Sequence, residues 1–219
     1  MVLKNERLGA SVLSALVISN VDAGLAASLE LKPHHRSLGI VTSDCDDVTY
    51  VALDEATKAA DVEVVYARSM YAGAGNASTK LAGEVIGIIA GPNPEEVRSG
   101  LDVAVYEIEN GASFYSANDD NSVPYFAHCV SRAGSYLSAG ANSTEGTAIA
   151  YLIAPPAEAM VGLDAALKAA DVQIGAFYGP PSETNFAGGL LVGSQSACRA
   201  ACDAFAKTVV AVANDPKSY

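Results

Sequence analysis

One motif occurs twice in this sequence, and this repeat limits the folds that are open to the chain. The first copy covers residues 55–66 and the second covers 164–175, and both contain Lys-Ala-Ala-Asp-Val. Each copy joins an alanine-rich helical segment to a β-branched strand, and a glycine-containing strand and an amphipathic helix follow. The period of about 105 to 110 residues is the size of a small domain, not of a solenoid repeat. We therefore predict a tandem duplication, with domains over 1–112 and 113–219.

The predicted strands and helices favour the α+β class. Strands alternate with helices in both halves, but the strands expected at 37–42 and 48–53 read as a hairpin around an acidic turn. Hairpins beside helices favour an antiparallel sheet covered by helices over a parallel βαβ fold. In this interpretation the strand expected at 148–153 is the second copy of the strand at 48–53.

Polar residues mark the expected starts of several helices. Asp22, Asn93 and either Ser194 or Ser196 have side chains that cap helix N-termini well, and Pro94 suits a first helical position. Asp54 is predicted to cap a short helix over 55–60.

Composition excludes some classes of function. The formal net charge of −12 disfavours nucleic-acid binding, which needs clustered Lys and Arg. The first residues lack the pattern of a signal peptide, and apolar runs such as 85–90 are far shorter than the roughly 20 residues of a membrane span. We expect a cytosolic protein that does not bind membranes and whose four cysteines are reduced.

A cluster of carboxylates is the first candidate site. Asp44, Asp46 and Asp47 lie within four residues, and Glu84 begins a later strand. Converging oxygens can hold a small cation, either an amine or a divalent metal. Aspartates also serve turns by accepting hydrogen bonds from backbone N–H groups. The residues alone leave both interpretations open.

Other residues that could bind a metal offer weaker patterns. The adjacent His34 and His35 are predicted to point apart on a strand, where they would chelate poorly. Cys198 and Cys202 share a face of an alanine-rich helix without two further donors at suitable spacing, so we predict that they are small core residues.

Two loops complete the set of candidates. Gly73 and Gly75 resemble part of a dinucleotide fingerprint, but they precede a strand and not a helix, so we expect them to provide backbone freedom. Residues 182–185 follow two prolines and offer hydroxyl, carboxylate and amide groups. They form either a ligand or pore edge or a plain loop. No set of catalytic side chains is evident, and no cofactor is expected.

Beyond these patterns, the chain resembles a known family over nearly its whole length. The duplicated unit resembles the bacterial microcompartment (BMC) shell domain. Particular stretches are similar to the tandem-domain shell proteins of ethanolamine-utilisation microcompartments, namely 35–39, 46–50, 54–58, 91–94, 131–138 and 180–185. The resemblance implies two circularly permuted BMC domains and a homotrimer with a hexagonal outline. Such trimers would tile with other shell proteins into a shell in the bacterial cytoplasm.

The resemblance also implies a ligand and two gating loops. Small pores in each subunit would bind ethanolamine through Asp46, Asp47, Glu84, Phe114 and Thr184. The loops 67–82 and 178–187 would open or close a central pore, and their residues of interest are Tyr71, Gly73, Gly75, Ser182, Glu183 and Asn185. A corrinoid is a further candidate partner, and a divalent metal could bind adventitiously at the three carboxylates.

Two other classes of function remain alternatives. A duplicated ligand-sensing regulatory protein could bind a small cation at the same carboxylates. A metal-dependent enzyme could use Asp46, Asp47 and Glu84, although the sequence shows no usable histidine, lysine or nucleophile beside them. A trimer that forms sheets would distinguish a shell protein from a sensor.

Overall fold

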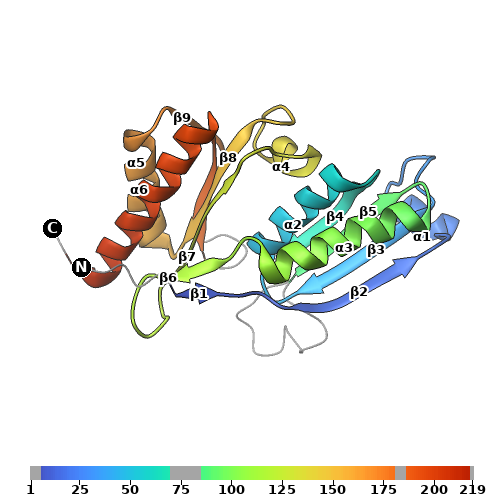
Figure 1. Cartoon of the computed structure of the whole chain (residues 1–219), viewed down its shortest axis with the longest axis horizontal. Helices are drawn as coiled ribbons and strands as arrows, with labels where there is room; N and C mark the ends of the chain where they lie inside the picture. The colour runs from blue at the N-terminus through green and yellow to red at the C-terminus, as the bar shows by residue number, and fades with distance from the viewer. Residues whose placement is uncertain (1–5, 70–84, 181–185, 218–219) are drawn as a thin grey trace. The chain divides into compact units, whose positions relative to one another are not determined.

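The computed structural model describes residues 6–69, 85–180 and 186–217, which form two compact units (Figure 1). The N-terminal unit comprises Ala10–Ala112 and the short segment Gly134–Leu137. The C-terminal unit comprises the remainder, including Met1–Gly9. Each unit therefore takes a short segment from the other half of the chain. The assignment of two domains divided between residues 112 and 113 stays a prediction.

A four-stranded antiparallel sheet forms the N-terminal unit. Its strand order is β2 (Val12–Ile18), β3 (Ser37–Ser43), β5 (Val85–Gly91) and β4 (Glu63–Ser69). Helices α2 (Asp46–Ala59) and α3 (Pro94–Asn110) lie side by side on one face of this sheet (Figure 1). The short helix α1 (Ala23–Ser28) connects β2 to β3.

A six-stranded antiparallel sheet forms the C-terminal unit. Its order is β1 (Arg7–Leu8), β6 (Phe114–Ser116), β7 (Pro124–Val130), β8 (Ala148–Ala154), β10 (Ala187–Gly193) and β9 (Val172–Tyr178). Helices α5 (Pro156–Ala169) and α6 (Gln195–Asn214) pack against each other and against the sheet. The six-residue helix α4 (Ser135–Gly140) follows β7 in the chain.

The duplication is visible in the order of the elements. The series β2, β3, α2, β4, β5, α3 recurs as β7, β8, α5, β9, β10, α6. The strand orders β2-β3-β5-β4 and β7-β8-β10-β9 are the same. Antiparallel sheets covered by helices confirm the predicted α+β class.

The hairpin predicted over 37–53 is wrong. Residues 48–53 belong to helix α2, and β3 pairs with β2 and β5. Val48, Val51, Ala52 and Ala56 are buried at the spacing of one helix face, so packing overrides the strand preference of the β-branched residues. The second copy of β3 is therefore β8. The prediction that residues 148–153 are the second copy of residues 48–53 is wrong, because residues 48–53 are helical. Asp54 lies inside α2 and does not cap a helix over 55–60.

Three predicted N-caps are confirmed. Asp22 Oδ1 accepts a hydrogen bond from Gly24 N at 2.8 Å, and Asn93 Oδ1 accepts one from Glu96 N at 2.9 Å. Ser194 caps α6, because its Oγ accepts from Ala197 N at 3.2 Å.

The cysteines occupy structural positions. Cys198 and Cys202 are buried in the core of the C-terminal unit together with Phe205, which confirms their predicted role. All four cysteines are free.

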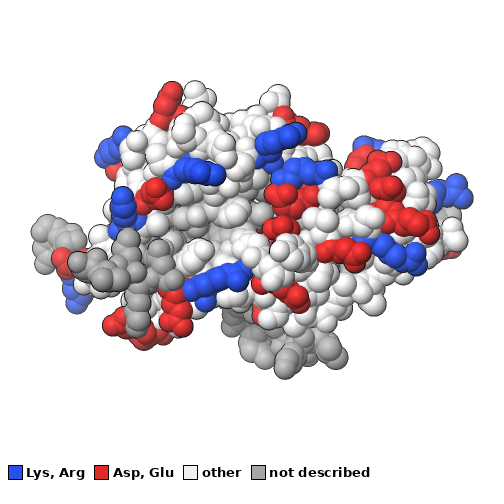
Figure 2. Space-filling model, viewed as in Figure 1, with Lys and Arg blue, Asp and Glu red and all other residues white. Residues whose placement is uncertain are grey.

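The described residues include no helix that is long and apolar enough to cross a membrane. On the face in view, basic side chains lie dispersed among acidic ones (Figure 2). Ion pairs along single helices, such as Lys168 with Asp164 at 2.6 Å, account for part of this mixing.

Candidate functional site

The predicted acidic turn is the connection from β3 into helix α2. Cys45 is the N-cap residue with an extended backbone, and its side chain makes no capping hydrogen bond. Asp46 and Asp47 form the first turn of α2, where the positive end of the helix dipole favours carboxylates. This connection between β3 and α2 therefore concentrates negative charge at one end of the sheet.

Asp46 joins the start of α2 to the end of β4. The hydroxyl of Ser69, the last residue of β4, donates to Asp46 Oδ2. The Tyr50 hydroxyl lies 3.0 Å from Ser69 Oγ, and Asp46 Oδ1 accepts from Asp47 N at 2.8 Å. This network fixes the Asp46 carboxylate beside the strand end.

Asp44 and Asp47 differ in their surroundings. The exposed Asp44 accepts a hydrogen bond from Ser11 N at 2.7 Å, which is the backbone-binding role that turn aspartates often have. Asp47 is only 6 % exposed. Burial and then the charge of Asp47 raise the pKa of the Cys45 thiol, so Cys45 stays protonated at neutral pH.

Several strands meet at this end of the sheet. Val85 begins β5 and pairs with Ser43 of β3 and with Ser69 of β4. Glu84 precedes Val85 in the chain and lies outside the described residues. The other predicted residues that lie outside them are Thr184 of the ethanolamine set and Tyr71, Gly73, Gly75, Ser182, Glu183 and Asn185 of the gating loops.

Phe114 is the third described residue of the predicted ethanolamine set. It begins β6 in the C-terminal unit, whereas Asp46 and Asp47 belong to the N-terminal unit. Its half-buried ring lies 5.2 Å from the ring of Phe126 and 6.2 Å from that of Phe186, measured between centroids. Phe114 is therefore part of an aromatic cluster.

The sequence interpretation missed the role of Asp54. This fully buried carboxylate accepts hydrogen bonds from Gly134 N at 2.7 Å and Leu137 N at 2.8 Å, and Lys58 Nζ lies 3.6 Å away. It thus caps the first turn of α4 from a distant part of the chain. Burial raises the pKa of Asp54. Its repeat counterpart Asp164 is exposed and has the same spacing to a lysine, so the motif contains no signal for this burial.

The interpretation of the adjacent histidines was wrong. His34 and His35 lie in a turn, with ring centroids 4.3 Å apart. A nitrogen of each ring and a carboxylate oxygen of Glu63 all lie within 4.8 Å of one another. The strand alternation that predicted diverging rings does not apply, because β3 begins only at Ser37.

Known proteins match the chain over nearly its full length. A family model for the BMC domain matches residues 37–118. The chain is 65 % identical to the bacterial microcompartment shell protein EutL of Clostridium perfringens, over 99 % of this chain and 100 % of the relative.

Solved structures agree with the sequence match. The crystal structure of the ethanolamine utilisation protein EutL from Leptotrichia buccalis is 65 % identical and superposes with a TM-score of 0.96, over 99 % of this chain and 100 % of that one. A trimeric microcompartment shell protein, PduB, shares the fold with a TM-score of 0.78 and 23 % identity, over 99 % and 96 % of the two chains. The chain therefore belongs to the EutL family of bacterial microcompartment shell proteins, whose role is structural.

Proposed function

We propose that the chain forms a homotrimeric pseudohexamer, which tiles with other shell proteins around a microcompartment in the bacterial cytoplasm and binds ethanolamine in small pores. The observation that supports the ligand is the pair of carboxylates at the start of α2, with Asp46 hydrogen-bonded to the last residue of β4. The predicted gating loop 67–82 begins within this strand.

The chemistry of ethanolamine suits this set of residues. The ligand is a small ammonium ion with a hydroxyl group. Asp46, Asp47 and Glu84 would provide negative charge and charge-assisted hydrogen bonds to the ammonium. The ring of Phe114 would add a cation–π interaction, and Thr184 would serve the alcohol.

Gating follows if the ligand prefers one state of the loops. A ligand shifts an equilibrium only by its difference in affinity for the two states. An ammonium ion at Asp46 would compete with the Ser69 hydroxyl for the same carboxylate, and Ser69 belongs to the predicted gating loop 67–82 together with Tyr71, Gly73 and Gly75. If occupied small pores favour closure of the central pore, ethanolamine would limit the passage of a larger cofactor, for which a corrinoid is the candidate.

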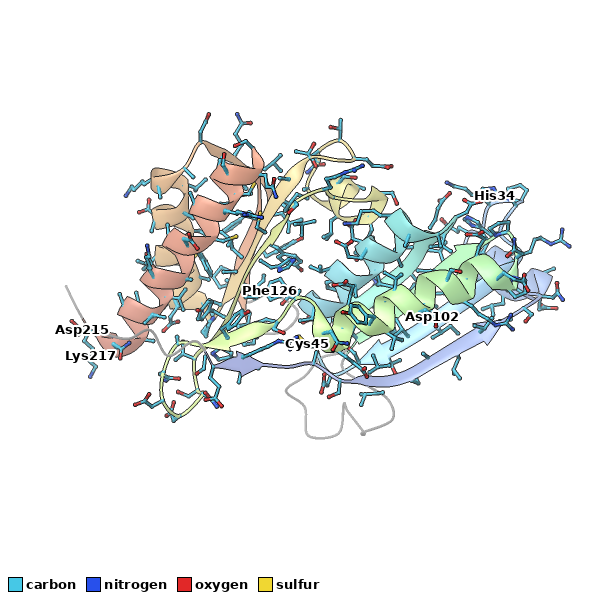
Figure 3. All side chains as sticks on the ribbon, viewed as in Figure 1. His34, Cys45, Asp102, Phe126, Asp215 and Lys217 are labelled. Carbon is cyan, nitrogen blue, oxygen red and sulfur yellow. The ribbon has the colours of Figure 1, made fainter. Side chains whose placement is uncertain are left out.

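Calorimetric titration of ethanolamine tests the site. We expect the double variant Asp46→Ala/Asp47→Ala to bind at least tenfold more weakly, because a hydrogen bond to a charged group contributes about 1.5–3 kcal/mol. Asp102→Ala is the matched control, since Asp102 is an exposed aspartate on α3 (Figure 3). Equal affinity of the double variant and the parent protein would exclude the site.

A divalent metal would compete for the same carboxylates. The titration is therefore repeated with a chelator present. Ethanolamine binding that persists with the chelator supports the proposal, and binding that disappears assigns the heat to a metal.

A further inference from the structure

A proline turn brings His34 and His35 together. His35 N donates to Lys32 O at 2.9 Å, which closes a four-residue turn with Pro33 at its second position, where proline is favoured. The next residue is held as well, because Arg36 N donates to Gly91 O at 2.9 Å. The two imidazoles therefore belong to a segment that is fixed against the end of β5.

Sheet register places Glu63 beside the same turn. Glu63 is the first residue of β4 and pairs with Ala90, which pairs on its other side with Leu38 of β3. The turn just before β3 thus lies near the start of β4. Glu63 Oε1 is 3.8 Å from His34 Nε2 and 3.7 Å from His35 Nε2.

The two distances to Glu63 suit one metal ion after a small movement, and the ring nitrogens of His34 and His35, which lie within 4.8 Å of each other, would approach by up to about 1.4 Å. Donor atoms bound to a tetrahedral zinc ion at about 2.0–2.1 Å lie about 3.4 Å apart, which is a few tenths of an ångström shorter than the distances to Glu63. The side chain of His35 is 2 % exposed, whereas His34 is 55 % and Glu63 41 % exposed. One ligand is fixed by packing, and two can adjust on a surface that is open to solvent.

We propose that His34, His35 and Glu63 form a binding site for a zinc-like divalent transition metal, with a fourth position open to water. Two imidazoles and one carboxylate are a ligand set that zinc uses when it keeps an open position. The metal would tie the turn of residues 32–35 to the start of β4.

Lys32 is the competitor for this site. Its Nζ lies 2.5 and 2.8 Å from the two oxygens of Glu63, so an ammonium ion now neutralises the carboxylate. Lys32 N also donates to His35 Nδ1 at 3.3 Å, and a metal at Nε2 requires the ring proton to be on Nδ1 instead. Metal binding therefore displaces the lysine side chain and ends this long hydrogen bond.

The site is separate from the acidic start of α2. Within the N-terminal unit, His34 and Cys45 lie at opposite ends of the sheet (Figure 3). The seven residues of β3 run between them, which corresponds to roughly 20 Å. An experiment that rules out one of the two proposed sites therefore does not affect the proposal for the other.

The test is a calorimetric titration of the full chain with zinc chloride. All variants carry Asp46→Ala/Asp47→Ala, so that those carboxylates bind no metal. We expect His34→Ala and Glu63→Gln each to weaken zinc affinity at least tenfold, because each removes one of three ligands. We expect Lys32→Gln to strengthen it several-fold. His128→Gln, at the remaining histidine, is the control and should change the affinity less than twofold.

Spectroscopy identifies the ligands independently. Ring ¹⁵N shifts of His34 and His35 should respond to zinc, and the Co²⁺ complex should lack the charge-transfer absorption of thiolate ligands. Equal zinc affinity of the Asp46→Ala/Asp47→Ala background with and without His34→Ala would overturn the proposal, as would thiolate absorption that accounts for all bound metal. The residues 32–35 and Glu63 would then be an ion-pair cluster only.

Discussion

At the scale of single residues, Asp54 shows how one carboxylate can gain a role that its repeat copy lacks. Both Asp54 and Asp164 precede a lysine by four residues, but only Asp54 is buried and accepts two backbone hydrogen bonds. Its oxygens replace the intrahelical partners that the first N–H groups of α4 lack. The segment Gly134–Leu137 therefore depends on Asp54 for its place in the N-terminal unit.

Removal of this carboxylate should be costly. We expect Asp54→Ala to lower the free energy of unfolding by about 2–5 kcal/mol, because two buried N–H groups lose their acceptor. Asp164→Ala should cost less than about 0.5 kcal/mol, since an exposed ion pair contributes little. Urea unfolding at one fixed protein concentration measures both. Similar losses for the two variants would contradict the assigned role.

The raised pKa of Asp54 determines how its contribution to stability changes with pH. The folded state binds the proton of Asp54 more tightly than the unfolded state does. Protonation of Asp54 therefore adds stability at pH values below its pKa in the unfolded chain, which is near 3.8. That stability is lost as the pH rises through the folded pKa. The stability difference between the parent protein and Asp54→Asn should therefore be largest at acidic pH and should shrink toward neutrality. A stability difference that grows with pH over this window would show that burial is not the main influence on the pKa of Asp54.

At the scale of elements, a glycine sets the distance between α3 and its sheet. A Cβ on Gly39 of β3 would lie 2.8 Å from side-chain atoms of Val97 and Leu101 and 2.9 Å from one of Ile89. The corresponding residue of β8 is Ala150, which has a Cβ. In α6, the residues that correspond to Val97 and Leu101 of α3 are Cys198 and Cys202. Smaller side chains on α6 thus accompany the larger residue in the strand, which gives these cysteines a packing role.

We predict that Gly39→Ala destabilises the protein by about 1–3 kcal/mol through overpacking. Val97→Ala removes one of the atoms that the new methyl group would meet, so the Gly39→Ala penalty should be smaller in a Val97→Ala background. Gly140→Ala is the control, because its Cβ would meet only an ordinary contact at 3.8 Å. If the losses of stability from Gly39→Ala and Val97→Ala simply add in the double variant, the contact with Val97 is not the cause of the Gly39→Ala penalty.

At the scale of the whole molecule, the duplication explains how one chain supplies two similar units. Each unit has its own sheet and its own pair of covering helices, and each takes in a segment from the other half. Three such chains would present six similar units around an axis, which is the basis of the proposed pseudohexamer.

The proposed assembly is tested by mass. Sedimentation equilibrium should give a species of three times 22.4 kDa. Electron microscopy at higher concentration should show flat hexagonal layers, because closed trimers with a hexagonal outline can tile. A monomer or dimer that never forms layers would instead favour the ligand-sensing alternative.

Local sequence patterns are enough to predict the class, the duplication and the starts of α1, α3 and α6, but not those of α2, α4 and α5. These features depend on local patterns, such as the Asn93-Pro94 start of α3 and the repeated Lys-Ala-Ala-Asp-Val motif. The sequence also indicated that Asp46 and Asp47 belong to one cluster, since they are neighbours in the chain.

Other features depend on residues that are distant in the chain, and the sequence did not predict them. Residues 48–53 became helical because one face of α2 is buried, which outweighs the local preference of valine and threonine for strands. Asp54 found its partners 80 and 83 residues away. His34 and His35 met Glu63 through a proline turn and the register of three strands. Local sequence cannot encode these contacts, because packing brings the partners together only after the sheet has formed.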